Sequence, residues 1–140
     1  MKHYFLDTNV VLDFLARREP FAEAALEVFR AGLEQRVTLY VASLSFSTIY
    51  YVMRKQTSRP AALTMVANLE KLVTVVAVDE TTIRHSVAAP FPDFEDGIQY
   101  YTAFLTPTIE AIITQNVADF AASALPVFTA AQALPHLPQS

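Results

Sequence analysis

The apolar residues of this chain follow two different spacings. In residues 20–35, Phe21, Val28 and Leu33 belong to a set of apolar positions at helical spacing, which is typical of a helix with one buried face. In residues 73–78 the apolar residues are almost all β-branched and follow one another without alternation. Such a run indicates a strand that is covered on both faces, as in a parallel sheet.

The two kinds of segment alternate along the chain. Strands are predicted over residues 4–6, 37–42, 73–78, 108–114 and 126–129. Helices are predicted over residues 9–17, 20–35, 43–56, 58–72, 79–88, 93–105 and 117–122, with a weak helix after the last strand. The alternation predicts an α/β fold, a three-layer α/β/α sandwich with a central, mainly parallel sheet of four or five strands. A chain of 140 residues is expected to form a single domain, here over residues 1–134, followed by a C-terminal tail over residues 135–140.

Composition narrows the class of protein. The chain is 53% hydrophobic, contains no cysteine and has only two glycines, Gly32 and Gly97. The absence of cysteine excludes disulfides and thiolate metal sites, and two isolated glycines exclude a phosphate-cradling loop. No apolar run reaches the length of a membrane span, and the N-terminus lacks the pattern of a secretory signal. We therefore expect a cytoplasmic protein with no membrane partner.

The formal net charge of −4 argues against a broadly basic surface for nucleic acid. Lysine and arginine gather in only two places, at Arg17–Arg18 and at Arg54–Lys55 with Arg59. Cations are favourable near the C-terminal ends of helices, so we interpret both clusters as solvated helix ends. Any nucleic acid would then be bound by a small part of the surface and not by a broad basic face.

Carboxylates recur where the predicted elements begin or end. They stand at Asp7 after the first strand, at Asp93, Glu95 and Asp96 where a helix opens, and at Asp119 past the fourth strand. The carboxyl ends of parallel strands face one crevice, so these groups are expected to converge. Gathered carboxylates repel one another and raise each other's pKa, and a bound divalent cation relieves that repulsion. The pattern predicts a site for Mg²⁺ or Mn²⁺, which take oxygen ligands.

Three segments, residues 5–10, 93–99 and 113–120, resemble in order and separation the acidic motifs of the PIN-domain nucleases, a family that includes the VapC-type ribonuclease toxins of toxin-antitoxin pairs. The resemblance spans nearly the whole chain and implies a PIN-like sandwich. It implies that Asp7, Asp96 and Asp119 are the catalytic, metal-binding acids. It further implies that Asn9 supports Asp7, while Thr114 and Asn116 shape the site around the fourth strand.

The chain departs from that family at the second acid, normally a glutamate early in the helix after strand two. Residues 43–51 contain no carboxylate. Thr48 most nearly occupies the position, with Ser47 as the alternative one residue away. A hydroxyl can contact a metal-bound water but brings no negative charge, so a lower metal affinity is expected. Glu95 or Asp93 is the candidate to substitute from the opposite side.

Each acid also has a structural interpretation. Asp7 and Asp93 are placed to cap the helices that follow them, and Glu95 is favourable in a first helical turn. For Asp93 and Glu95 we prefer these structural roles. Asp96 is placed to reach back to a cap, and Asp119 fits the start of a short helix. A shared site is favoured only when Asp7, Asp96 and Asp119 are taken together in the order of the family.

The leading hypothesis is a Mg²⁺- or Mn²⁺-dependent endoribonuclease that hydrolyses RNA phosphodiesters as the toxin of a toxin-antitoxin pair. The alternative is a catalytically impaired PIN-like module that binds RNA or an antitoxin, which the missing second acid favours. A phosphatase with an aspartyl nucleophile ranks last, because Asn9 stands where its proton-donating acid would be needed. The resemblance also implies an antitoxin that blocks the acidic crevice, and a homodimer.

Overall fold

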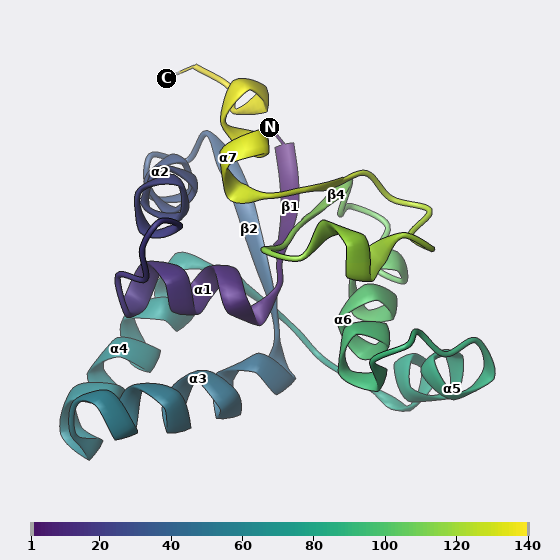
Figure 1. Ribbon diagram of the computed structural model, residues 1–140, viewed down its shortest axis with the longest axis horizontal. Helices are drawn as coiled ribbons and strands as arrows, with labels where there is room; N and C mark the ends of the chain where they lie inside the picture. The colour runs from purple at the N-terminus through teal and green to yellow at the C-terminus, as the bar shows by residue number, and fades with distance from the viewer. Residues whose placement is uncertain (1, 140) are drawn as a thin grey trace.

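Five parallel strands form the centre of the fold. The computed structural model describes residues 2–139 of the chain (Figure 1). The strands are β1 (Lys2–Leu6), β2 (Val37–Ala42), β3 (Thr74–Val76), β4 (Ala111–Ile113) and β5 (Val127–Phe128). They lie in the order β3-β2-β1-β4-β5, and each neighbouring pair is parallel. This order puts β1 in the middle, so Asp7, the next residue, stands at the centre of the edge where the strands end.

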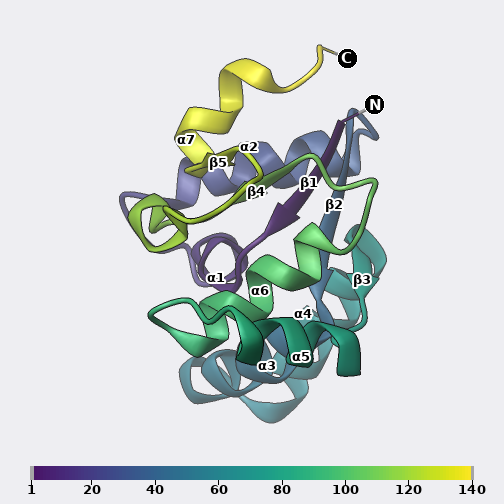
Figure 2. The same ribbon diagram turned by 90° about the vertical axis from the view of Figure 1, so that its right-hand side faces the viewer.

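Helices cover both faces of the sheet. They are α1 (Thr8–Leu15), α2 (Ala22–Leu33), α3 (Ser43–Gln56), α4 (Arg59–Leu72), α5 (Glu80–Ala88), α6 (Phe94–Phe104) and α7 (Ala130–Ala133), with 3-10 turns η1 (Val117–Phe120) and η2 (Leu134–His136). Helices α1 to α4 and α7 share one buried core, and α6 shares another with η1. Figure 1 shows α5 and α6 together on one side and α1 to α4 on the other, and Figure 2 gives the turned view. The predicted three-layer α/β/α sandwich with a parallel sheet is confirmed.

The central strand contributes to both cores. Tyr4 and Leu6 belong to the first core and Phe5 to the second, because successive side chains of a strand point to opposite faces. The register pairs Phe5 with Tyr40 of β2 and with Ile112 of β4, and both partners lie in the second core. An unbroken apolar run is therefore what this position in the sheet requires.

Strand β3 corrects one prediction. Residues 73–78 were expected to form a strand covered on both faces, but pairing is limited to Thr74–Val76 and the side chain of Val75 is 42% exposed. The strand lies at the edge of the sheet next to β2. Its β-branched residues favour an extended backbone at an edge as well as in the centre, so composition alone does not distinguish the two positions.

Strand β4 is also shorter than predicted. Its pairing with β1 spans Ala111–Ile113, not residues 108–114. The backbone N–H of Ile109 donates to the carbonyl of Thr106 at 3.0 Å, which closes a turn before the strand. The β-branched residues 108 and 109 therefore belong to that turn.

Helix α2 begins at Ala22, later than the predicted start at residue 20. Leu33, predicted on its buried face, is 68% exposed. Gly32 takes the inward position instead, because a Cβ atom there would stand 2.7 Å from Leu39 Cδ1 of β2. The absence of a side chain lets the end of α2 approach the sheet, and Leu33 is left facing solvent.

The predicted cap at Asp93 is confirmed, because its carboxylate accepts from the backbone N–H of Asp96 at 3.1 Å. Asp79 caps α5 in the same way and accepts from the backbone N–H of Thr82 at 3.0 Å. No helix within residues 2–139 combines the length and the apolar character that a membrane span needs. The boundary between a domain ending at residue 134 and a tail beginning at residue 135 stays a prediction.

Candidate functional site

Asp7 is held rigidly where β1 ends and α1 begins. Its backbone N–H donates to the carbonyl of Ile113 at 2.9 Å, which continues the pairing of β1 with β4. The carboxylate, 5% exposed, accepts from the backbone N–H of Thr8 at 2.8 Å and from the hydroxyl of Thr114 at 2.8 Å. Asp7 thus caps α1 as the structural interpretation expected, and its position is also fixed by the end of β4.

Burial raises the pKa of the Asp7 carboxyl above its ordinary value. The hydrogen bonds from Thr114 and Thr8 stabilise the charged form and offset part of the rise in pKa, whereas the negative charges of Glu95 and Asp119 add to it. Two acidic segments distant in the chain, one containing Glu95 and the other Asp119, therefore raise the pKa of Asp7.

Asp96 lies in the first turn of α6, on the opposite layer of the sandwich from α1. Burial raises the pKa of its carboxyl to about 6, and the negative charges of Asp7, Asp93, Asp119 and Glu95 contribute in that order. The charge of Asp7, which comes from a different layer of the sandwich, thus disfavours ionisation of Asp96. A positive charge placed between them would relieve this repulsion.

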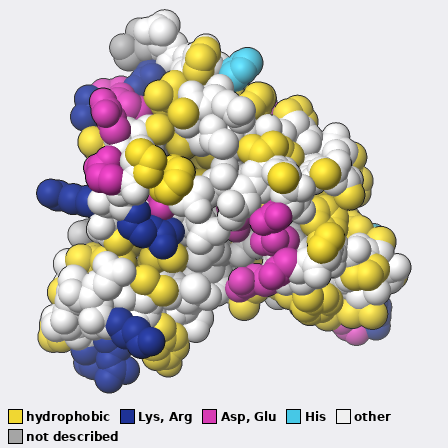
Figure 3. Space-filling model, in the orientation of Figure 1, with side chains coloured by type: hydrophobic (Ala, Val, Ile, Leu, Met, Phe, Trp, Pro, Cys, Tyr) yellow, Lys and Arg dark blue, Asp and Glu magenta, His cyan; other side chains and the backbone are white. Residues whose placement is uncertain are grey.

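Asp119, in η1, is exposed and completes an open depression lined by Pro92, Asp93, Asp96 and Asp119. Figure 3 shows acidic side chains gathered on one side of a hollow in the surface, with lysine and arginine side chains across from them. The structure therefore brings the three predicted acids into one electrostatic environment. It also brings Asp93 and Glu95, for which capping and first-turn roles were preferred, into the same cluster.

Within residues 2–139, no three His, Cys, Asp or Glu side chains are arranged as a ready-made metal site. The chemistry of the groups present nevertheless suits a hydrated Mg²⁺ or Mn²⁺, because Mg²⁺ retains several waters and is commonly bound by one or two carboxylates together with phosphate oxygens. Such an ion would favour the charged forms of Asp7 and Asp96, whose pKa values are raised.

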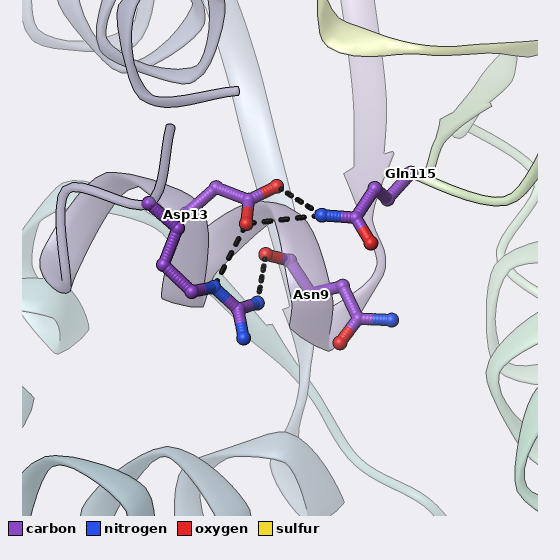
Figure 4. A network of polar contacts seen from close by, with 4 residues as sticks. Asn9, Asp13 and Gln115 are labelled. Carbon is purple, nitrogen blue, oxygen red and sulfur yellow. Dashed lines mark hydrogen bonds and ion pairs between the residues drawn. The ribbon is translucent and has the colours of Figure 1, made fainter. Parts of the chain in front are cut away.

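The predicted supporting residues are placed differently from one another. Thr114, fully buried, contacts Asp7 directly, and the backbone N–H of Asn116 donates to the Thr114 hydroxyl at 3.2 Å. Asn9 uses its backbone carbonyl, which accepts from Arg18 Nη2 at 3.2 Å, and Figure 4 shows its side chain directed away from this network. A supporting role of the Asn9 side chain stays a prediction. Thr48 is half-buried on α3 and supplies no charge.

A buried polar cluster next to Asp7 was missed by sequence reasoning. Thr8 Oγ1 and Ser45 Oγ share a hydrogen bond of 2.7 Å. Gln99 Nε2, on α6, donates to Ser45 Oγ at 2.9 Å and to Thr8 Oγ1 at 3.2 Å. A signal for it exists in the sequence, since Ser45 shares its helical face with the buried Ile49 and Met53, four and eight positions later, and a hydroxyl on such a face needs a partner.

A second polar network joins Asp13, Arg18 and Gln115 and shows that one prediction, that of Arg18, was wrong (Figure 4). Arg18 was interpreted as a solvated helix end, but its Nε lies 2.9 Å from Oδ1 of Asp13, a residue that is 2% exposed. Gln115 Nε2 donates to both Asp13 oxygens, at 3.1 and 3.0 Å. The network joins α1 to the segment after β4, beside the site.

The fold is a parallel α/β sandwich with acidic side chains gathered near the edge where its central strands end. The sequence profile of the PIN domain family matches residues 3–118. The chain belongs to the PIN-domain family. A comparison with curated proteins finds no match.

Solved structures of toxin-antitoxin proteins are similar in fold. DNA-bound VapBC from Salmonella typhimurium matches with a TM-score of 0.67 and 16% identity over 93% of this chain and 99% of that one. A toxin-antitoxin complex from Klebsiella pneumoniae gives 0.65 and 20%, covering 91% and 97%. VapC20 of Mycobacterium tuberculosis, a sarcin-ricin loop cleaving toxin, gives 0.62 and 11%, covering 78% and 86%. The predicted membership of the PIN-domain family is confirmed, and the chain shares its fold with these structures.

Proposed function

We propose that this PIN-domain protein is a divalent-metal-dependent endoribonuclease and the toxin of a toxin-antitoxin pair. The observation that carries the proposal is that Asp7 and Asp96, which come from different layers of the sandwich, both have raised pKa values, and that the negative charge of Asp7 disfavours ionisation of Asp96. Titratable groups whose pKa values are shifted by burial together with a specific neighbouring charge cluster at functional sites.

In this proposal Asp7, Asp96 and Asp119 hold Mg²⁺ or Mn²⁺. When bound, the metal polarises the phosphodiester and lowers the pKa of a coordinated water. Thr114 and the backbone N–H of Thr8 keep the Asp7 carboxylate in one orientation. The further charges of Glu95 and Asp93 offset part of what the missing second acid would have supplied.

The RNA backbone would be bound by cations outside the acidic cluster. Arg17 at the end of α1, and Arg54, Lys55 and Arg59 at the junction of α3 with α4, are exposed. In the described part of the chain none of these four forms an ion pair, whereas Arg18, Arg30, Arg36 and Arg84 do. Unpaired cations across a hollow from the acids are suited to phosphates of a single strand. Arg54 and Lys55 are exposed in the last turn of α3, as the interpretation of solvated helix ends expected, and the proposal adds a contact with phosphate.

The fold neighbours described as toxin-antitoxin complexes support an antitoxin as the protein partner. An antitoxin that inserts a cationic side chain among Asp7, Asp96 and Asp119 would satisfy the same charges as the metal and would block it. A homodimer and a cytoplasmic location complete the proposal.

Purified protein incubated with RNA and Mn²⁺ or Mg²⁺ tests the activity. Asp7→Asn removes one charge at nearly constant shape and keeps a side chain that can still cap α1, so cleavage should be lost while the fold persists. Asp79→Asn is the matched control, because Asp79 also caps a helix, α5, but lies outside the acidic cluster. Equal cleavage by wild type and Asp7→Asn would overturn the mechanism.

A specific observation favours the second candidate, a binding module without catalysis. Helix α3 presents Thr48 and no carboxylate where the family places its second acid. Thermal unfolding in the presence of Mg²⁺ distinguishes the two, because a ligand that binds only the folded state raises the melting temperature. A rise in wild type that Asp7→Asn abolishes supports the nuclease. No rise at millimolar Mg²⁺, together with no RNA cleavage, supports the binding module.

A further inference from the structure

Gln99 connects the two layers of the sandwich at the edge where the acids converge. It lies on α6, which packs in the core on one side of the sheet, while its hydrogen-bond partners Thr8 and Ser45 lie on α1 and α3 on the other side. Within residues 2–139 these two bonds are the only side-chain hydrogen bonds that join α6 to α1 or α3. The Gln99 side chain is 1% exposed, so water does not compete freely for its donors.

Each end of the hydrogen bond between Gln99 and Thr8 lies close in sequence to one of the acids. Thr8 follows Asp7 directly and its N–H holds the Asp7 carboxylate at 2.8 Å. Asp96 precedes Gln99 by one helical turn on α6. A shift of Gln99 against Thr8 therefore changes the separation between Asp7 and Asp96, because each acid belongs to the same rigid turn as one end of the link.

The Gln99 amide donates to its two hydroxyl partners and leaves its oxygen without a partner within residues 2–139. Both Nε2 donors are used, while Oε1 is the one buried side-chain nitrogen or oxygen among the described residues without a hydrogen-bond partner. A buried acceptor without a donor is unfavourable for stability.

We propose that Gln99 is a positioning residue that fixes the spacing of Asp7 and Asp96 by bonding across the sandwich to Thr8 and Ser45. The inference rests on the proposed function in so far as that spacing serves metal binding. In this chain the link occupies the region of α3 that precedes Thr48, where the family carries its second acid. The hydrogen bonds of Gln99 thus hold α6 at a fixed distance from α3, as a metal ion shared by ligands on both helices would also do.

The first test measures Mn²⁺ affinity by calorimetry. Gln99→Met removes the link and the unpaired acceptor while keeping an unbranched side chain of similar length. The dissociation constant for Mn²⁺ should rise about 10-fold, as is usual when a residue that orients metal ligands is lost. Ser45→Ala removes one of the two bonds and should give a smaller rise, which keeps the test usable if Gln99→Met folds poorly.

Thr102→Val is the matched control. Thr102 lies on the same helix, is equally buried at 1% exposed, and donates its hydroxyl only to the carbonyl of Ile98 within α6, at 2.7 Å. A merely structural role for Gln99 predicts that both variants lower the unfolding free energy and leave the Mn²⁺ affinity alone. Equal Mn²⁺ affinity in Gln99→Met, Ser45→Ala and wild type would overturn the inference.

A second measurement needs no metal. Because the chain contains no cysteine, Ser47→Cys on α3 and Val87→Cys on α5, both at exposed positions, give two unique sites for nitroxide spin labels. The distance distribution between them, measured by pulsed electron paramagnetic resonance, should broaden or shift when Gln99→Met is added and stay unchanged with Thr102→Val. An unchanged distribution in Gln99→Met overturns the positioning role.

The two failures are distinguishable. If wild type binds no Mn²⁺ and cleaves no RNA, the proposed function fails, and the spin-label distances alone decide whether Gln99 sets the spacing of the layers. If wild type binds Mn²⁺ and the Gln99→Met distances and affinity match it, the nuclease proposal stands and the positioning role fails.

Discussion

The hydroxyl of Thr114 donates to Oδ2 of Asp7 at 2.8 Å, joining residues 107 positions apart in the chain. Both residues are buried where β1 and β4 end, next to each other in the sheet. The bond stabilises the charged form of Asp7 against the effect of burial. It makes the carboxylate usable as an anion in a site that otherwise disfavours one.

Removal of this bond should raise the pKa of Asp7 further. Thr114→Val keeps the shape and deletes the donor, so at neutral pH the buried carboxylate is less well solvated and the unfolding free energy should fall by about 1 to 3 kcal/mol. Carboxyl carbon chemical shifts followed by NMR against pH measure the change in pKa. Thr102→Val, which deletes a buried hydroxyl remote in bonding from Asp7, should leave the pKa of Asp7 as it is in wild type.

Stability should depend on pH through Asp96. The pKa of its carboxyl is about 6 in the folded protein against an ordinary value of 3.8, so the folded state binds the proton more tightly. The stabilisation is complete below 3.8 and is lost as pH rises through about 6. In metal-free buffer, the unfolding free energy of Asp96→Asn measured in urea should increase relative to that of wild type as the pH rises from 3.8 through about 6. Partial exposure of Asp96 screens the effect, so its direction is the prediction.

Asp79→Asn gives the opposite sign and serves as the comparison. The backbone N–H of Thr82 lowers the pKa of the Asp79 carboxyl below 3.8, so its stabilisation is present above that pH and is lost on acidification. Wild type should therefore lose its advantage over Asp79→Asn as the pH falls below 3.8, and the two should differ little in their response between about pH 5 and 7. A similar profile for both variants would contradict the electrostatic account of Asp96.

Arg18 should matter more for stability than other ion-pairing cations. Arg18→Met removes the charge that faces the buried Asp13 and leaves that carboxylate with Gln115 as its side-chain donor. The unfolding free energy measured in urea should fall by about 1 to 3 kcal/mol. Arg84→Met removes an ion pair with Glu80 whose side chains are 74% and 76% exposed, and the expected loss is under about 0.5 kcal/mol. Equal losses would mean that Asp13 is stabilised by other groups.

RNA binding should depend on the cations at the junction of α3 with α4. Arg54→Ala combined with Lys55→Ala should weaken binding of single-stranded RNA and lower the slope of log affinity against log salt by about 0.7 for each phosphate that is no longer neutralised. Lys71→Ala is the control, because Lys71 is exposed and unpaired within residues 2–139 but lies at the other end of α4, near β3. Fluorescence anisotropy with catalytically inactive Asp7→Asn avoids cleavage during the titration. Equal weakening by Lys71→Ala would indicate non-specific charge attraction.

Much of the fold could be read from local patterns, because strands and helices differ in period and helices begin at capping residues such as Asp7 and Asp93. The errors lie where tertiary position overrides local preference. Val75 is β-branched and exposed because its strand is at an edge, and Leu33 faces solvent because Gly32 packs on Leu39. Neither the exposure of Val75 nor that of Leu33 could be predicted from the residue type or its local spacing.

The sequence by itself determined the order of elements, the parallel sandwich and the three positions from which carboxylates reach one edge, since each follows from periodicity and from where a strand or helix stops. Only the tertiary structure decided which polar groups hold those carboxylates. Thr114 with Asp7, Gln99 with Ser45, and Arg18 with Gln115 through Asp13 are bonded because strands and layers distant in the chain meet there. Hydrogen bonds act over about 3 Å, so their partners are fixed by packing and not by sequence spacing.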